Sequence, residues 1–177
     1  MAASTTLHCL TGCAIGEILG LMVGTALDLD STATIILAIG LAFVFGYTLS
    51  TLPLIKSGLS LRSALILVLA ADTLSIATME LTDNAVMVLI PGAMNAGLVN
   101  PIFWIGMMIA LTVAFFAAYP VNRWLIGRGK GHALVHEYHA HGIAGSWRRF
   151  IPEISTGVLA AMITAFMVGG LVVSIAG

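Results

Sequence analysis

Long apolar segments separated by short polar stretches make up most of the chain. About twenty consecutive apolar residues cross the hydrocarbon core of a bilayer as an α-helix. Segments of at least that length cover residues 5–27, 32–52, 60–90, 101–125 and 152–175. The pattern therefore predicts an all-α fold: a polytopic membrane helical bundle with a four-helix core and a fifth, C-terminal span.

Turn-forming residues mark the ends of these segments. The first segment ends at the acidic turn 28–31, and Pro53 and Pro91 are expected to end the second and the third. Proline suits the first turn of a helix, so Pro101 predicts where the fourth begins. At 1.5 Å per residue, the third segment is longer than a simple crossing needs. We expect it to tilt, to project beyond the bilayer, or to break near residues 82–84.

Composition excludes several classes of protein. The chain is 59% hydrophobic and only 8% charged. Its mean hydropathy of +1.07 is far higher than a soluble domain needs to bury its core. No basic cluster for nucleic acid and no phosphate-binding glycine loop occurs in the sequence. No set of nucleophile and base stands out either, so we do not expect an enzyme. The two cysteines do not form a Cys-x-x-Cys motif or a disulfide framework.

Basic residues predict the orientation of the chain in the membrane. They are Lys56, Arg62, Arg123, Arg128, Lys130, Arg148 and Arg149. With five spans, all of them fall on one side, which the positive-inside rule makes cytoplasmic. We therefore expect a multi-pass protein of the inner (plasma) membrane, with its N-terminus in the cytoplasm and its C-terminus outside.

The polar stretch before the last span divides the chain into three parts. Residues 1–130 are predicted to form a four-span membrane core, residues 131–149 a His- and Gly-rich cytoplasmic linker, and residues 150–177 an accessory fifth transmembrane helix. The linker holds His132, His136, His139 and His141. A solvated loop is the expected form of such a segment. If it is helical, His132 and His136 are neighbours with a spacing compatible with a divalent metal.

The first segment contains four side chains of metal-ligand type. His8, Cys9, Cys13 and Glu17 lie there, and the last three recur every fourth residue, so a helix stacks them on one side. Burying such groups in hydrocarbon costs free energy, so each of them needs a compensating partner. Coordination of a transition metal would explain the set. Tight helix packing remains the alternative for the two cysteines.

A ridge of small residues lies beside these side chains. Gly12, Gly16, Gly20 and Gly24 also recur every fourth residue. This spacing is typical of membrane helices that approach one another closely. We interpret the four glycines as a helix-packing surface.

The third segment carries a second set of candidate ligands. Asp72, Met79 and Asp83 follow one helical stripe, and Asp83 and Met87 belong to a second, overlapping stripe. Thioethers suit Cu(I), and carboxylates suit harder cations. Alternatively, the methionines are ordinary apolar residues, and Glu80 and Asp83 lie exposed in the headgroup zone.

Two of these acids are expected at a similar depth. Counting along each helix from the same side, Glu17 lies about 18 Å and Asp72 about 15 Å into the membrane. Carboxyl groups at that depth should share a proton, hold a cation or face a water-filled cavity. A structural hydrogen bond between protonated acids is the alternative.

Three blocks of the sequence resemble one uncharacterised family of bacterial membrane domains of unknown function. They are His8-Cys9-x-x-Gly12-Cys13-x-x-Gly16-Glu17, Ala71-Asp72-Thr-Leu-Ser-Ile-Ala-Thr-Met79-Glu80 and Ala118-Tyr-Pro120-Val-Asn122-Arg-Trp-Leu. The resemblance covers roughly residues 5–135 and implies four spans. The family is associated with copper proteins, including fusions to multicopper oxidases, so the resemblance implies a link to copper.

These observations favour a membrane protein that binds or moves copper as Cu(I). The expected ligands are His8, Cys9, Cys13, Glu17, Asp72, Met79, Asp83 and Met87, with a copper ion as the bound metal. Two alternatives stay open. In the first, the chain is a small non-transporting subunit or assembly factor whose glycine ridge packs on a larger membrane complex. In the second, it is a proton-coupled carrier of another cation. The expected partners are the lipid bilayer, a metal ion, and either further copies of the chain or that larger complex, but not nucleic acid.

Overall fold

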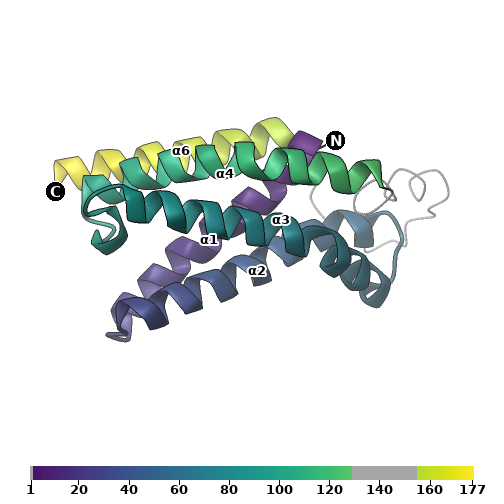
Figure 1. Ribbon diagram of the computed structural model, residues 1–177, viewed down its shortest axis with the longest axis horizontal. Coiled ribbons are helices and arrows are strands. Elements are labelled where there is room, and N and C mark those ends of the chain that lie inside the picture. Colours follow the sequence, from purple (N-terminus) through teal and green to yellow (C-terminus); the bar gives the residue numbers. More distant parts are fainter. Residues whose placement is uncertain (1, 129–154) are drawn as a thin grey trace.

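The computed structural model describes residues 2–128 and 155–177 (Figure 1). Its helices are α1 (Ala2–Ala26), α2 (Ser31–Lys56), α3 (Leu61–Leu89), the short 3-10 helix η1 (Ala93–Asn95), α4 (Pro101–Gly127) and α6 (Thr156–Ala176). The described part of the chain contains no strand. Five of the helices are long and apolar enough to cross a membrane, which confirms the all-α bundle with five spans. The histidine-rich segment 131–149 lies outside the described residues.

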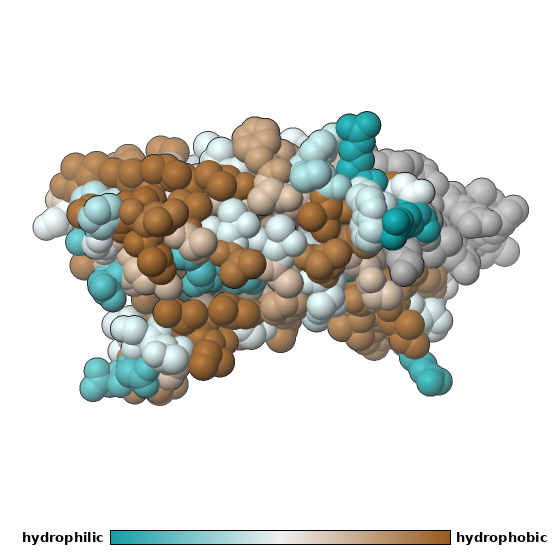
Figure 2. Space-filling view, viewed as in Figure 1, coloured by the Kyte–Doolittle hydropathy of each residue, from teal (hydrophilic) through white to brown (hydrophobic). Residues whose placement is uncertain are grey.

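Successive long helices alternate in direction along the bundle (Figure 1). The N-terminus, the α2–α3 turn and the last residues of α4 lie at one end, which carries Lys56, Arg62, Arg123 and Arg128 and is called the basic end below. The α1–α2 turn, η1 and the C-terminus lie at the other. We call it the acidic end, after Asp28 and Asp30. Figure 2 shows hydrophilic residues gathered at both ends and hydrophobic residues over much of the surface between them.

Local capping explains several helix boundaries. The Asp30 side chain accepts from the backbone N–H groups of Thr32 and Ala33 at 2.9 and 3.1 Å and begins α2. After the C-terminal end of α3, Gly92 turns the chain with a φ of 83°, which glycine adopts without strain. Asn100 begins α4 by accepting from the N–H of Ile102 at 3.0 Å.

The expected stop of α2 at Pro53 is wrong, because the helix continues to Lys56. Proline inside a helix removes one hydrogen bond and crowds the preceding turn. Here the last turn of α2 is stabilised by packing instead. Leu54 is buried in a separate apolar cluster with Ala64 and Val68 of α3. This cluster holds the α2–α3 turn together at the basic end.

Helix α3 neither breaks nor bends away at residues 82–84 but runs unbroken to Leu89. Its first turns pack on the end of α2 through Ala64 and Val68. In Figure 1, this part of α3 reaches past the N-terminus of α1. Of the three expected solutions for its length, the break near residues 82–84 is therefore wrong.

The glycine ridge of α1 lies against α2. A Cβ atom added at Gly12, Gly16, Gly20 or Gly24 would fall within 3.0 Å of α2 atoms. The two backbones therefore touch from Gly12 to Gly20, and Gly24 packs on the side chain of Thr34. The ridge is occupied inside the chain, so it is not the surface that would pack on a larger complex.

Helices α4 and α6 complete the bundle on the other side of α1. Asn122 of α4 donates from Nδ2 to Oγ1 of Thr6 at 2.9 Å, and both side chains are buried. Helix α6 packs on α1 and α4. Gly170 of α6 lies over the Trp104 ring, and the ring is edge-on to Phe166 with 5.7 Å between centroids. Most of α6 faces outward, as expected of an accessory span.

The close α1–α2 contact predicts that replacing glycine by alanine changes the stability of the protein in opposite directions at Gly16 and Gly40. Gly16→Ala places a methyl group against the backbone of Leu41 and Ala42, whereas Gly40 has no atom within 4 Å of an added Cβ. Overpacking should cost about 1–3 kcal/mol, and alanine gains about 1 kcal/mol in helix propensity at either site. Thermal unfolding in detergent should therefore show Gly16→Ala less stable and Gly40→Ala as stable as the unaltered protein or more so. Equal stability of the two variants would contradict the contact.

Candidate functional site

Buried polar side chains line the contact between α1 and α3. On α1, Cys9, Cys13 and Glu17 follow the stripe next to the glycine ridge, about 100° around the helix. Because the ridge faces α2, this neighbouring stripe faces α3. We call the set of facing groups the polar seam. It consists of Cys9, Cys13, Glu17, Ser50, Asp72, Ser75, Glu80 and Asp83, all buried.

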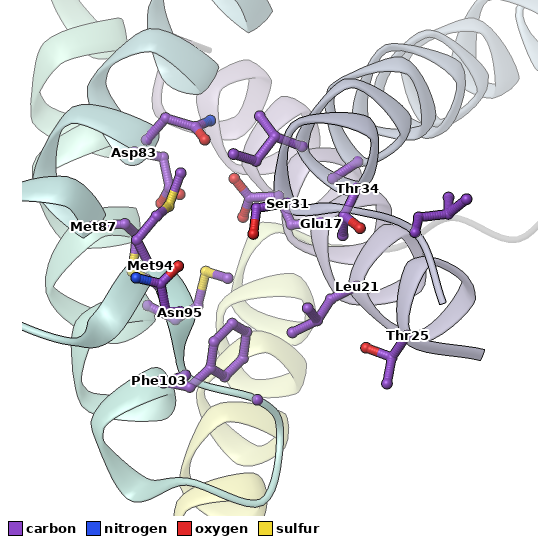
Figure 3. A pocket seen from close by; sticks show the side chains of 17 residues that line it. Glu17, Leu21, Thr25, Ser31, Thr34, Asp83, Met87, Met94, Asn95 and Phe103 are labelled. Atoms are coloured by element: carbon purple, nitrogen blue, oxygen red, sulfur yellow. The ribbon is translucent and has the colours of Figure 1, made fainter. Parts of the chain in front are cut away.

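The pair nearest the acidic end consists of two carboxyl groups. Glu17 of α1 and Asp83 of α3 face each other (Figure 3). Two carboxyl groups can hydrogen-bond only when one of them carries a proton, because neither carboxylate can donate. Glu17 Oε2 and Asp83 Oδ1 have no partner. The pair therefore has acceptor capacity left for a proton, water or a cation.

The next pair, one turn toward the basic end, joins a thiol to a carboxyl. Cys13 of α1 faces Glu80 of α3. Glu80 is only 4% exposed, and neither of its oxygens has a hydrogen-bond partner. The exposed headgroup position expected as an alternative for Glu80 is therefore wrong. A buried carboxyl beside a thiol can accept the thiol proton or join it in holding a cation.

The third group lies nearest the basic end. Cys9 Sγ is 3.9 Å from Oγ of Ser50 on α2. Asp72 lies beside Cys9 and Ser50, and Ser75 also lies beside Cys9. Asp72 Oδ2 and Ser75 Oγ have no partner. Ser50 carries no signal in the sequence, since a lone serine in an apolar helix is common at packing contacts.

Glu17 is level with Asp83, not with Asp72 as the depth count predicts. Asp72 lies beside Cys9, two turns from Glu17. The count assumed that α1 and α3 start at the same depth. They do not, because the first turns of α3 pack on the end of α2 beyond the start of α1.

Unsatisfied oxygen atoms are concentrated in the polar seam. Within residues 2–128 and 155–177, the buried side-chain oxygens without a hydrogen bond belong to Glu17, Asp72, Ser75, Glu80 and Asp83, and to Thr51 outside the seam. Buried polar groups are nearly always hydrogen-bonded, because an unpaired one costs about 1–3 kcal/mol. So many unpaired acceptors along one contact favour a site that binds protons, water or cations.

The polar seam meets a cavity of about 350 Å³ at the acidic end. Glu17, Leu21 and residues of α2 form one side (Figure 3). Asp83 and Met87 of α3 form the other, together with residues of η1 and α4. The cavity reaches the α1–α2 turn and η1, so it connects the carboxyl pair with the acidic end of the bundle.

The remaining predicted ligands lie apart from the seam or only at its edge. His8 is half-buried, and its Nδ1 is 2.8 Å from the backbone oxygen of Ser4 in the same helix. Met79 is buried in the main apolar core, and Met87 lines the cavity. Across residues 2–128 and 155–177, no three His, Cys, Asp or Glu side chains gather as a ready metal site. The structure thus divides the predicted ligands into successive small groups.

Residues 1–131 match a family described as a domain of unknown function (DUF4396). The chain belongs to this family. No curated protein and no solved structure matches the chain. The DUF4396 region includes α1 to α4 with the whole polar seam and leaves out α6. The polar seam of this chain therefore lies within the part that matches the family, and α6 lies outside it.

The burial of both thiols predicts slow alkylation. Cys9 and Cys13 are free cysteines and are 0% and 2% exposed. In folded protein in mild detergent, N-ethylmaleimide should modify both at least about tenfold more slowly than in protein unfolded by SDS, because reaction needs an accessible thiolate. Mass spectrometry of the alkylated chain measures both rates. Fast labelling of the folded protein would show that the seam opens to water.

Proposed function

We propose that this DUF4396 protein is an integral membrane protein that carries a soft transition metal ion, most simply Cu(I), along the polar seam. One observation carries the proposal. Groups of two to four ligand-type side chains follow one another between α1 and α3, and the group nearest the acidic end faces a cavity.

Small successive groups suit movement better than tight storage. Conduction needs several sites, each weak enough to release its ion. Successive groups are four residues apart on α1, a step of about 6 Å along the helix. No three His, Cys, Asp or Glu side chains gather within the described ranges, so these four residue types form no ready tight site along the seam.

The thiols favour a soft ion. Cys13 and Cys9 supply sulfur at two of the three groups, and thiolates select soft ions such as Cu(I). A thiol must lose its proton to bind metal. Glu80 is placed to take the proton from Cys13, so that the Sγ–H bond breaks as the Sγ–metal bond forms and the proton moves to a Glu80 oxygen. Charge in the seam then changes only by the charge of the ion.

The distribution of charge gives the proposed location. The basic residues of α2, α3 and α4 lie at one end, which the positive-inside rule places in the cytoplasm. The cavity then faces the outside of the inner membrane. An ion would meet Glu17 and Asp83 first from that side and Cys9 last.

The number of carboxyl groups favours a second candidate, a proton-coupled carrier of a harder cation. Glu17, Asp72, Glu80 and Asp83 outnumber the two thiols, and carboxylates suit harder cations. The cysteines would then only pack between helices. The two candidates differ in whether sulfur is needed.

Flux in proteoliposomes should separate them. We expect the unaltered protein to carry Ag(I), a soft ion that stays monovalent, and the Cys9→Ser, Cys13→Ser double variant to lose at least about tenfold in rate, equivalent to about 1.4 kcal/mol. Glu80→Gln should also slow the flux, since it cannot take the thiol proton. Thr78→Val is the matched control on α3, because the Thr78 hydroxyl bonds only to its own helix in the described contacts.

Sulfur-independent transport would reject the soft-metal proposal. If Cys9→Ser, Cys13→Ser leaves flux intact while Asp83→Asn abolishes it, the second candidate holds. If reconstituted protein carries no ion above empty vesicles, both transport proposals fail.

A further inference from the structure

We infer that the cavity at the acidic end contains a binding site of its own for a soft monovalent cation, formed by the thioethers of Met87, Met94 and Met107 above the Glu17–Asp83 pair. All five side chains line the same cavity. This site adds to the proposed function without depending on it, because it requires binding in the cavity and no movement along the seam.

Three separate elements bring the methionines together. Met87 is in the last turns of α3, Met94 in η1 and Met107 in α4. The turn at Gly92 folds η1 back after α3, and the N–H of Ala93 donates to the oxygen of Ile90 at 3.1 Å. Figure 3 shows Met87 and Met94 on the same side of the cavity as Asp83, opposite Glu17.

Helix α4 makes room for the Met87 sulfur by carrying a glycine. A Cβ added at Gly106 would lie 3.1 Å from Met87 Sδ and 3.0 Å from Cβ of Ala93. Any larger residue at position 106 would push the thioether or η1 aside. Met87 and Met107 are 5% and 3% exposed, so their sulfurs are held inside the protein.

The acids distinguish this cavity from an ordinary methionine-lined gap. Methionine often fills irregular apolar space, and the groove between α1 and α6 is also lined by three methionines, Met22, Met162 and Met167. That groove has no acidic lining residue. Thioethers are neutral, so a cation leaving water for them needs nearby negative charge, which Glu17 and Asp83 supply. Unpartnered Glu17 Oε2 and Asp83 Oδ1 are free to do so.

The chemistry defines the class of ligand. Sulfur ligands without a charge select soft ions of low charge, such as Cu(I) or Ag(I), over hydrated Mg²⁺ or Ca²⁺. One carboxylate of the pair is enough to balance one such ion. Binding requires no proton from a thioether, and no bond in the protein is broken.

Equilibrium binding of Ag(I) tests the site with the seam thiols removed. In a Cys9→Ser, Cys13→Ser background, purified protein in detergent should retain about one Ag(I) per chain by dialysis and elemental analysis. Adding Met87→Leu, Met94→Leu and Met107→Leu should weaken this binding at least tenfold, because leucine keeps the volume but not the sulfur. The matched control is Met22→Leu, Met162→Leu and Met167→Leu, which should leave Ag(I) binding unchanged.

Two results would overturn the inference. One is the absence of Ag(I) from the cysteine-free protein. The other is binding that survives the three cavity substitutions but is lost in Glu17→Gln, Asp83→Asn, which would describe a carboxylate site. If the cavity variant does not fold, X-ray absorption of Ag(I) bound to the cysteine-free protein decides, since sulfur neighbours support the site and oxygen neighbours alone reject it. A failure of vesicle flux leaves all these outcomes intact, because none of them measures transport.

Discussion

Direct backbone contact between α1 and α2 is the constraint on which the other features of this protein depend. With glycine at every fourth position, α1 has one rotation at which it can lie this close to α2. That rotation turns the next stripe, Cys9, Cys13 and Glu17, toward α3. The polar seam is thus aligned by residues that have no ligand chemistry themselves. A bulky side chain in the ridge would move all three polar side chains of α1 at once.

The seam also shows how a membrane-like bundle tolerates four acids in its interior. None stands alone, since each faces a carboxyl, a thiol or a hydroxyl on another helix. Apolar packing on both sides keeps the groups in place: the main core includes Ile76 and Met79 of α3, and a separate cluster holds the α2–α3 turn. Each of the four acids nevertheless keeps at least one oxygen without a hydrogen bond.

Most of the fold could be predicted from the sequence, because apolar length and turn residues act locally. Turn residues mark the turn at Gly92 after α3 and the start of α4 at Asn100. Pro53 does not end α2, because the packing of Leu54 outweighs the free-energy cost of a proline inside the helix. The candidate site was predictable only in part. Periodicity identifies which face of α1 carries Cys13 and Glu17, but the partner of each depends on the relative shift of α1 and α3. That shift depends on tertiary contacts at the α2–α3 turn, so the sequence pairs Glu17 with Asp72, whereas the structure pairs it with Asp83.

The central position of α1 has a consequence for how the protein is made. Helix α1 is synthesised before the other four candidate spans, and it is the least apolar of the five. Its glycine face can be covered as soon as α2 follows, and the pair can then leave the insertion machinery as a hairpin. Glu17 meets Asp83 only after about seventy further residues have been added, and Thr6 meets Asn122 later still. During that interval, the ionisable face of α1 has to stay near water or near the translocation channel. The order of synthesis therefore leaves the polar face of α1 without its α3 partners until residue 83 has been added.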